Sequence, residues 1–250
     1  MTDAYIVGAV RSAGGKKNGR LSKIHPIDLG AEVVDALVAK TGVAVSEIDD
    51  LIFGCVSQVG AQSSNIARNI CLSSVLGEVV PGTTVDRQCG SGQQAMHFAA
   101  QGVLSGTQDL VIAGGVESMS QVPIGANIID GYKAEHGLPY GKKMSERYPG
   151  VQFNQFAGAE MLAHKYELTQ NELNAFAFDS HVKAKRAVLE GRFKDEIVAI
   201  QIELEDGTTE SHEQDEGIRM DATLGAIAGL QPLQENGLLS AANASQICDG

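Results

Sequence analysis

The chain lacks any long apolar run. No stretch of about 18 consecutive apolar residues occurs in its 250 residues, and the opening MTDAYIVGAVRSAGG has no charged segment followed by a long apolar one. A membrane span and a secretory signal are therefore not expected. We predict a soluble protein of the cytoplasm.

Cysteine is scarce, and the four that occur show neither a paired framework nor the spacing of metal ligands. They are Cys55, Cys71, Cys89 and Cys248. We therefore expect reduced thiols and no disulfide. Cys55 and Cys71 fall on the apolar faces of an expected strand and an expected helix, which predicts that both are core residues.

Metal-ligand and phosphate-binding motifs are also missing. His164, His181 and His212 have no partner in an HxxxH or cysteine pattern, so we expect surface or helix-face residues and no metal site. No GxGxxG follows an expected strand, and no GxxxxGK occurs. A dinucleotide site and a P-loop therefore have little support.

Positive charge is in deficit, because 19 Lys and Arg face 31 Asp and Glu, a formal net charge of −12. Such a charge argues against binding to nucleic acid and against adhesion to an anionic membrane surface. Hydrophobic residues make up 43% of the chain. This content is enough to bury a sizeable core in one large domain or two smaller ones.

The first half of the chain contains an alternation of expected strands and helices. Apolar runs predict strands at 5–10, 51–56, 82–85 and 109–115. Apolar residues at helical spacing predict a helix that carries Leu29 and Val38 and ends at Gly42, a second at 65–76, and a third after Cys89. Strands that alternate with helices of this length form parallel βαβ units, so we expect an α/β fold.

From residue 121 to about 239 the chain is more polar and is interrupted by glycine, which predicts a second, loop-like domain. Helices are expected at 156–166 and at 169–190, the second broken near Phe178-Asp179, and a strand at 197–204. Thr169 and Glu172 match the capping-box pattern at the start of the second helix.

Cys89 stands where an expected strand turns into an expected helix. The β-prone run 82–85 precedes it, and apolar residues follow at helical spacing from 95 to 104. At a helix N-terminus the unpaired N–H groups and the helix dipole favour a thiolate, the nucleophilic form of cysteine. The Gly90-Ser91-Gly92 segment leaves the sulfur uncrowded, and the small residues of the helix predict burial on several sides. A core cysteine is the alternative that these residues alone leave open.

Two longer motifs carry a resemblance to a known family. VDRQCGSG at 85–92 and AGGVESMS at 113–120 resemble the thiolase family of acyl-CoA acyltransferases, and the similarity runs from residue 6 to 250. It implies a thiolase-like βαβαβαβ layered α/β fold with an inserted loop domain. The implied domains are an N-terminal domain with the nucleophile at 1–120, a loop domain at 121–239, and a return into the N-terminal domain at 240–250. Asp86 departs from the commonest family pattern, which has asparagine there.

The resemblance also implies roles for single residues. Cys89 is the acyl-thioester nucleophile, Arg219 faces the adenosine part of coenzyme A, and Ala241 and Ser245 lie along its pantetheine arm. An ion pair of Arg219 with Asp215 or Glu216 is the alternative that stays open. Because coenzyme A carries phosphates, basic side chains must gather locally in this acidic chain. The candidates are Lys142, Lys143, Arg147, Lys183, Lys185, Arg186 and Arg219.

Three further segments of the family have no counterpart between residues 1 and 250. They carry an Asn-Glu pair, a Gly-His-Pro histidine that deprotonates the nucleophile, and a second cysteine in Cys-Gly-Gly. His97 lies eight residues into the helix and cannot reach back to Cys89, since each residue advances about 1.5 Å. We therefore expect the N-terminal part of a thiolase with its C-terminal domain absent, and no turnover from this part alone.

The implied enzyme exchanges acyl groups in two steps, with the Cys89 thiolate accepting the acyl group. Acyl-CoA and coenzyme A are its substrates, no separate cofactor is implied, and the family forms homodimers or homotetramers. Within the family, Asp86, the segment 151–160 and the segment 246–249 resemble thiolases of fatty-acid degradation that take longer or bulkier acyl chains, rather than biosynthetic acetyl-CoA acetyltransferases. The alternatives are a condensing enzyme of the β-ketoacyl synthase type and a non-catalytic thiolase-like binding module.

Overall fold

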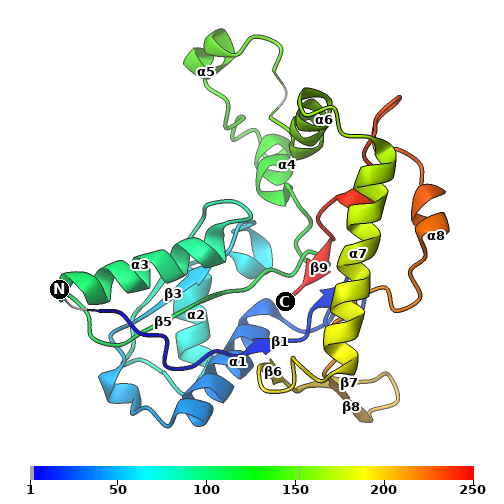
Figure 1. Ribbon diagram of the computed structural model, residues 1–250. Helices are drawn as coiled ribbons and strands as arrows, with labels where there is room; N and C mark the ends of the chain where they lie inside the picture. The colour runs from blue at the N-terminus through cyan, green and yellow to red at the C-terminus, as the bar shows by residue number, and fades with distance from the viewer. Residues whose placement is uncertain (1–2, 152) are drawn as a thin grey trace. The chain divides into compact units, whose positions relative to one another are not determined.

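The computed structural model describes residues 3–151 and 153–250 (Figure 1). The chain forms two compact units. Unit 1 consists of Met1–His136, Asp195–Glu216 and Ile247–Gly250, and unit 2 consists of Gly137–Lys194 and Gly217–Gln246. These compact units need not coincide with domains, and they place residues 121–136 and 195–216 in unit 1. The domain bounds expected from the sequence therefore stay a prediction.

A three-stranded parallel sheet lies at the centre of unit 1. β3 (Asp50–Gly54) is its middle strand, with β4 (Gly82–Val85) on one side and β5 (Val111–Gly115) on the other. Helices α2 (Ile66–Ser73) and α3 (Ser91–Ser105) connect these strands. The expected βαβ units are therefore confirmed, and the carboxyl ends of the three strands meet at one edge.

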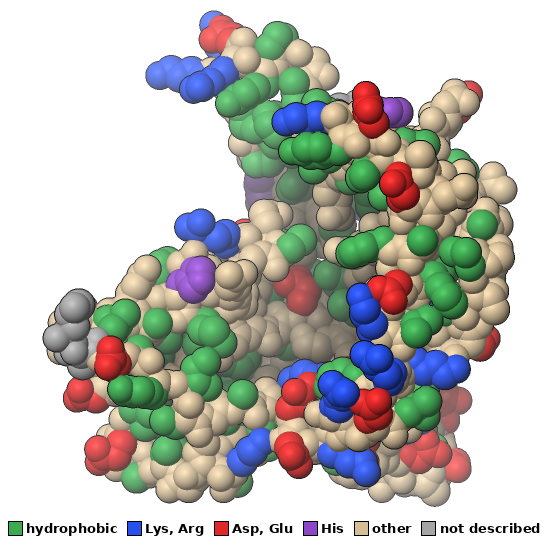
Figure 2. Space-filling model, viewed as in Figure 1, with side chains coloured by type: hydrophobic (Ala, Val, Ile, Leu, Met, Phe, Trp, Pro, Cys, Tyr) green, Lys and Arg blue, Asp and Glu red, His purple; other side chains and the backbone are tan. Residues whose placement is uncertain are grey.

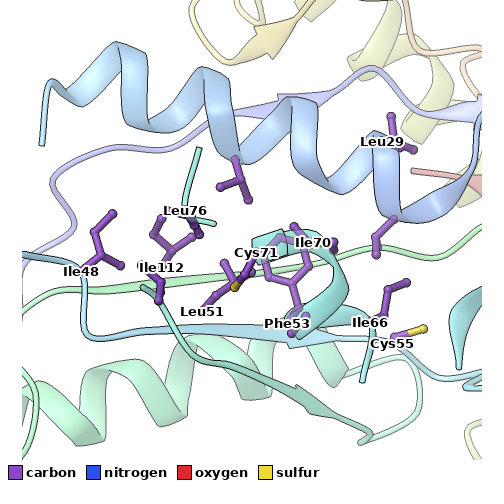
Figure 3. Packing of buried hydrophobic residues seen from close by; sticks show 14 of the residues in the cluster. Leu29, Ile48, Leu51, Phe53, Cys55, Ile66, Ile70, Cys71, Leu76 and Ile112 are labelled. Carbon is purple, nitrogen blue, oxygen red and sulfur yellow. The ribbon is translucent and has the colours of Figure 1, made fainter. Parts of the chain in front are cut away.

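Different helices cover the two faces of this sheet. Leu51 and Phe53 belong to the main core cluster, together with residues of α1 (Pro26–Thr41) and α2. Figure 3 shows Phe53, Ile70 and Cys71 packed between the sheet and α1. On the other face, Ile52 packs against the small residues of α3. This division follows from the strand itself, because successive side chains point to opposite faces.

Helix α1 begins and ends as its sequence predicts. His25 accepts a hydrogen bond from the Ile27 N–H at its Nδ1 (3.3 Å), and Pro26 occupies the first helical position. Asp28 lies in the first turn, where the helix dipole favours negative charge. Gly42 ends the helix with φ 68°, a left-handed conformation that glycine adopts without strain.

Short strands and one helix complete unit 1. The strand expected at 197–204 is confirmed, although it is interrupted at Ala199. The remaining ladders are β1 (Arg11–Ser12) parallel to β6 (Ile197–Val198), β2 (Gly15–Lys16) antiparallel to β9 (Cys248–Asp249), and β7 (Ile200–Glu203) antiparallel to β8 (Thr209–His212). Helix α4 (Ala126–Lys133) follows β5.

The first strand is much shorter than expected. A buried strand is predicted at 5–10, but only Arg11 and Ser12 form β1. Tyr5, Ile6 and Val7 are 78%, 75% and 68% exposed. Within the described residues no strand pairs with positions 5–10, so nothing covers these apolar side chains.

Helix α3 is less enclosed than expected. Ala95 and Ala99 are buried against the sheet, whereas Met96, Phe98 and Leu104 are 50%, 41% and 51% exposed. The expectation of burial on several sides is therefore wrong for the face that carries these large side chains. The small residues alone make the close contact with the strands.

Unit 2 is mainly helical. Its helices are α5 (Lys142–Arg147), α6 (Gln155–Lys165), α7 (Gln170–Leu189) and α8 (Leu224–Ala228). The predicted capping box is present, with Thr169 and Glu172 each bound to the other's backbone N–H. The break expected near Phe178-Asp179 does not occur, because α7 contains neither glycine nor proline to interrupt its hydrogen bonds.

Candidate active site

Cys89 lies between β4 and α3, at the edge where the parallel strands end. Val85 is the last residue of β4, and α3 begins at Ser91 with Gly90 as its N-cap. Cys89 stands one position before the cap, and its side chain is exposed. The strand-to-helix placement predicted for this cysteine is therefore confirmed.

The turn that carries Cys89 has an unusual backbone. Gln88 has φ 49°, in the left-handed region that a residue with a Cβ adopts only at a free-energy cost. Its N–H donates to Asp86 Oδ1 (2.7 Å). Its carbonyl oxygen accepts from the N–H (2.9 Å) and the hydroxyl (2.6 Å) of Ser91. Hydrogen bonds therefore hold both the backbone N–H and the backbone carbonyl of Gln88, the residue immediately before Cys89.

Gly54, at the end of β3, lets the start of α3 approach the sheet. A Cβ on Gly54 would collide with the backbone of Ser91 and Gly92. Gly114 and Gly115, at the end of β5, allow a second close approach. A Cβ on Gly114 would meet the Phe53 ring at 2.9 Å, and one on Gly115 would meet the carbonyl oxygen of Gly54 at 2.9 Å. The glycine pair thus lets β5 lie close to β3, and the Gly114 carbonyl oxygen also lies beside α3, 3.8 Å from the position of a Cβ on Gly92.

The other three thiols have environments that suppress the thiolate. Cys55 is buried, and burial followed by the Glu117 carboxylate raises its pKa to about 12. Cys71 is buried as well, and burial raises its pKa. The Cys248 side chain is exposed, but desolvation of its sulfur and the charges of Asp249 and Glu117 raise its pKa. The prediction that Cys55 and Cys71 are core residues is confirmed.

Glu117 links the end of β5 to the loop after β3. Its carboxylate accepts hydrogen bonds from Val56 N–H (2.7 Å), Ser57 N–H (3.1 Å) and Gln62 Nε2 (3.0 Å). Gln62 is fully buried and its Oε1 accepts from Ser118 N–H (2.6 Å). These bonds fix the loops at the same edge of the sheet as the Cys89 turn.

Arg219 is exposed in unit 2, and the backbone around it is held by α7. His181 Nδ1 accepts from the Arg219 N–H (3.2 Å), and Lys185 Nζ donates to the Met220 carbonyl (2.6 Å). His181 and Lys185 are one helical turn apart, so they lie on one face of α7. The segment therefore rests on two successive points of the same helix.

Asp215 and Glu216 have basic partners within unit 1. Asp215 binds Arg11 in a two-bond arrangement (2.7 and 3.0 Å), and Glu216 lies 3.6 Å from Lys16 Nζ. Both carboxylates belong to unit 1 and Arg219 belongs to unit 2, so the alternative that pairs them stays a prediction.

Ala241 and Ser245 lie in a second exposed segment of unit 2. Ala241 begins a short 3-10 turn in which Asn243 Nδ2 donates to the carbonyl of Leu173 on α7 (2.9 Å). Leu173 and His181 are eight residues apart, about 12 Å along the helix axis. Helix α7 thus carries both segments expected to bind coenzyme A, whereas Cys89 belongs to unit 1.

Charge divides unevenly between the units. Unit 2 has ten Lys and Arg against eight Asp and Glu, a net +2, whereas unit 1 has nine against 23, a net −14. All of the basic candidates for the coenzyme A phosphates fall in unit 2. Two of them have acidic partners, Lys142 with Glu146 (3.6 Å) and Lys183 with Asp179 (2.5 Å). Figure 2 shows Lys and Arg side chains at α5, at the top of the view.

His212 corrects an expectation from the sequence. It is 2% exposed, with Nε2 3.1 Å from the Ala13 carbonyl oxygen, rather than a surface residue. Its partner across the β7–β8 ladder is Ile200, which is fully buried, so both side chains share the covered face. Among the described residues no group of three or more His, Cys, Asp or Glu could hold a metal ion. In that same part of the chain, no helix is long and apolar enough to cross a membrane.

A cavity of about 430 Å³ lies elsewhere in unit 1. Its lining is mainly apolar and comes from α1 and β5, with Arg11, Ser12 and Asp215 among its polar residues. Cys89 does not line it. The cavity is therefore separate from the Cys89 turn.

Sequence reasoning did not find the roles that Gly54, Gln88 and Ser91 have in supporting the Cys89 turn. A signal existed for Gln88, because aspartate often accepts a hydrogen bond from the N–H two residues further on, and Asp86 stands at that spacing. No local signal existed for Gly54, since its close neighbours are more than 35 residues away in the sequence.

Comparisons with known proteins agree with this geometry. The model of the thiolase N-terminal domain matches residues 4–250. The chain is 43% identical to the steroid 3-ketoacyl-CoA thiolase FadA6 of Mycobacterium tuberculosis, covering 100% of this chain and 60% of that protein. It is 37% identical to a 3-ketoacyl-CoA thiolase of Bacillus subtilis, covering 100% and 64%.

A solved structure shows the same fold. The acetyl-CoA acetyltransferase of Bacillus anthracis superposes with a TM-score of 0.85 at 33% identity, over 100% of this chain and 64% of that one. The chain thus spans about 60% of the length of these relatives, and the expected thiolase-like α/β fold is confirmed. On both grounds, this chain belongs to the thiolase family, of which it carries the N-terminal domain.

Proposed function

We propose that Cys89 is the acyl-accepting nucleophile of an acyl-CoA acyltransferase that cleaves 3-ketoacyl-CoA. The observation that carries the proposal is the exposed thiol on the turn between β4 and α3, in a chain whose three other thiols have raised pKa values. Relatives named 3-ketoacyl-CoA thiolase support the reaction class.

The reaction runs through an acyl-cysteine. The Cys89 thiolate attacks the keto carbon of the substrate and forms the new C–S bond. The bond between that carbon and the acetyl-CoA part breaks, and the acetyl-CoA carbanion takes up a proton and leaves. The thiol of coenzyme A then loses its proton and attacks the acyl-cysteine, which releases the Cys89 thiolate and the shortened acyl-CoA. The thioester supplies the activation, so no cofactor besides the substrate coenzyme A is required.

Coenzyme A binds to unit 2 in this proposal. Arg219 faces its adenosine part, and Ala241 and Ser245 lie along the pantetheine arm. Two features support the assignment: both segments are anchored on α7, and unit 2 carries a net +2 in a chain of −12. A locally positive surface attracts the phosphates of coenzyme A against the overall negative field.

We further propose that the enzyme works in the degradative direction on substrates with a long or bulky acyl chain. It acts in the cytoplasm as a homodimer or homotetramer. The relative with 43% identity is named a steroid 3-ketoacyl-CoA thiolase, which supports a bulky substrate. Nucleic acid and membrane have no place in this function, because the chain is strongly acidic.

The test is coenzyme A-dependent cleavage of a 3-ketoacyl-CoA by the full-length gene product. We expect Cys89→Ser to lower acetyl-CoA release by at least about 10³-fold, because a serine hydroxyl is a far weaker nucleophile at neutral pH than a thiolate. Cys248→Ser, which changes the other exposed thiol, is the control and should keep its activity. Full cleavage by Cys89→Ser would overturn the proposal.

A further inference from the structure

We propose that Asp86 is the positioning residue for Cys89, acting by holding Gln88 in its left-handed backbone conformation. The inference rests on the proposed role of Cys89 as nucleophile. It concerns a position where this chain differs from the commonest family pattern, and it assigns Asp86 a task through the backbone rather than a contact with substrate.

Gln88 has an unfavourable backbone conformation. It has φ 49°, and it is not a glycine, so its Cβ crowds the following carbonyl in this region. Such a residue stays left-handed only when the surrounding contacts compensate for that cost. At this turn those contacts are hydrogen bonds on both sides of Gln88.

Asp86 supplies the bond on the N–H side. Its Oδ1 lies 2.7 Å from the Gln88 nitrogen, a short distance that is typical of a donor bound to a charged acceptor. Ser91 supplies the bonds on the carbonyl side and also accepts from the Arg87 N–H at its hydroxyl (2.9 Å). Ser91 is 5% exposed, whereas Asp86 is exposed.

The conformation of Gln88 decides where the sulfur lies. The carbonyl of Gln88 belongs to the peptide group that leads into Cys89, so a change of Gln88 to the right-handed region would rotate this peptide and redirect the Cys89 side chain. The neighbouring α3 could not follow such a rotation, because Gly54 already packs against the backbone of Ser91 and Gly92. A released turn would therefore hold the thiol in several orientations, of which few suit attack on a bound thioester.

The acceptor atom matters here, and the negative charge does not. An asparagine at position 86 has a side-chain oxygen at the same place and tolerates the same turn. Alanine has no acceptor. Glycine at position 88 adopts φ > 0 without cost and has no need of the bond from Asp86.

The experiment uses four variants of the full-length gene product: Asp86→Ala, Asp86→Asn, the double variant Asp86→Ala with Gln88→Gly, and Asp206→Ala. The last is the matched control, because Asp206 accepts from the N–H of Thr208 (3.0 Å), also two residues on, in the turn between β7 and β8. The readouts are kcat and KM for 3-ketoacyl-CoA cleavage, the rate of iodoacetamide labelling at Cys89, and the melting temperature.

We expect Asp86→Ala to lower kcat by up to about tenfold with little change in KM, as for the loss of one hydrogen bond. Asp86→Asn and the double variant should return to within about threefold of the unchanged protein, and Asp206→Ala should match it. An unchanged kcat in Asp86→Ala, a defect in Asp86→Asn as large as that in Asp86→Ala, or no recovery in the double variant would each overturn the proposal.

Failure of the proposed function gives a different result. If Cys89→Ser cleaves the substrate at the normal rate, Cys89 is not the nucleophile. The labelling rates at Cys89 still report on the turn in that case, because they measure the presentation of the thiol without reference to catalysis. Slower labelling in Asp86→Ala with recovery in the double variant would then support the positioning of Cys89 by Asp86, although the proposed catalytic function had failed.

Discussion

Unit 1 buries large apolar side chains, whereas unit 2 buries mainly small or polar ones. The main core cluster lies wholly in unit 1 and includes Leu29, Leu51, Ile66 and Ile70. The buried residues of unit 2 are Ala163, Ala177, Ile227 and Leu239, with the polar Glu160, Asn174 and Ser240. The first unit is therefore held by packing, and the second depends more on specific hydrogen bonds.

Glu160 illustrates how unit 2 is held. Its carboxylate is 7% exposed and accepts from the N–H groups of Leu238 (3.0 Å) and Leu239 (2.9 Å). The difference between the units matches the tasks proposed for them. Covalent chemistry needs a thiol fixed to within a fraction of an ångström, which the strand ends of a packed sheet supply. For the proposed binding of coenzyme A, an accessible surface with positive charge is favourable, and unit 2 carries a net +2.

The largest expected effect sharpens the contrast among thiols within unit 1. In the native full-length protein at neutral pH, iodoacetamide should label Cys89 at least about 10²-fold faster than Cys55, because the reagent attacks the thiolate. A pKa of about 12 leaves Cys55 almost entirely protonated. Peptide mapping by mass spectrometry measures the order of labelling. First labelling at Cys55, Cys71 or Cys248 would contradict this account.

A large effect is also expected when the core of unit 1 is opened. Ile70 is fully buried on α2, so Ile70→Ala should lower the free energy of unfolding by about 2–5 kcal/mol. The matched change in unit 2 is Met161→Ala on α6, at a side chain that is 72% exposed, and it should cost less than about 0.5 kcal/mol. Urea denaturation of both variants measures the difference. Equal losses would show that the buried position in the core of unit 1 contributes no more to stability than the exposed position in unit 2.

A smaller, pH-dependent effect is expected at Asp215. Burial alone would raise its pKa, but the hydrogen bonds from Arg11 and from Gly14 N–H outweigh burial and leave the pKa below its ordinary value. A carboxylate with a lowered pKa stabilises the fold above its unfolded pKa, near 3.9. This stabilisation is lost as the pH falls through the pKa that the carboxyl group has in the folded protein.

Asp215→Asn should therefore lower the free energy of unfolding by about 1–2 kcal/mol at pH 7, as for hydrogen bonds to a charged group. Its deficit against the unchanged protein should begin to shrink below about pH 4, the pKa of the unfolded carboxyl, and should disappear as the pH falls through the lower pKa of folded Asp215. Urea denaturation across this pH range provides the measurement. A deficit that stays constant down to pH 3 would mean that the charge of Asp215 contributes nothing.

The smallest effect is expected on the exposed surface of unit 2. Arg219→Ala should weaken coenzyme A binding several-fold, as for a single partly exposed charge contact, and leave acyl transfer from acetyl-pantetheine nearly intact. Arg192→Ala is the control, because Arg192 already pairs with Glu190 (2.6 Å) in the same unit. Titration calorimetry and an acyl-transfer assay measure both quantities. Equal losses with coenzyme A and with acetyl-pantetheine would show that Arg219 is structural.

The elements whose signals are local could be predicted from the sequence. The ends of α1 follow from Pro26 and Gly42, and the start of α7 follows from its capping box at Thr169. The position of Cys89 between β4 and α3 follows from the apolar runs on either side. Each of these features depends on residues within one or two turns of the chain.

The features that depend on distant partners could not be predicted. The pairing of strands decides that the side chains at 5–7 are exposed and that His212 is buried. Ile200 is the residue opposite His212 in the β7–β8 ladder, and both side chains lie on the covered face. The close contact of Gly54 with the start of α3 likewise joins segments far apart in the sequence. Periodicity identifies an element and its apolar face, but it does not identify what lies opposite.

The most direct test of the account is to trap the acyl group on the protein. The full-length gene product is incubated with acetyl-CoA in the absence of an acceptor, quenched in acid and digested, and the peptides are analysed by mass spectrometry. The account predicts an acetyl group on the peptide that contains Cys89, and its removal when coenzyme A is added before the quench. Active protein that carries the acetyl group on a different residue, or none at all, would contradict it.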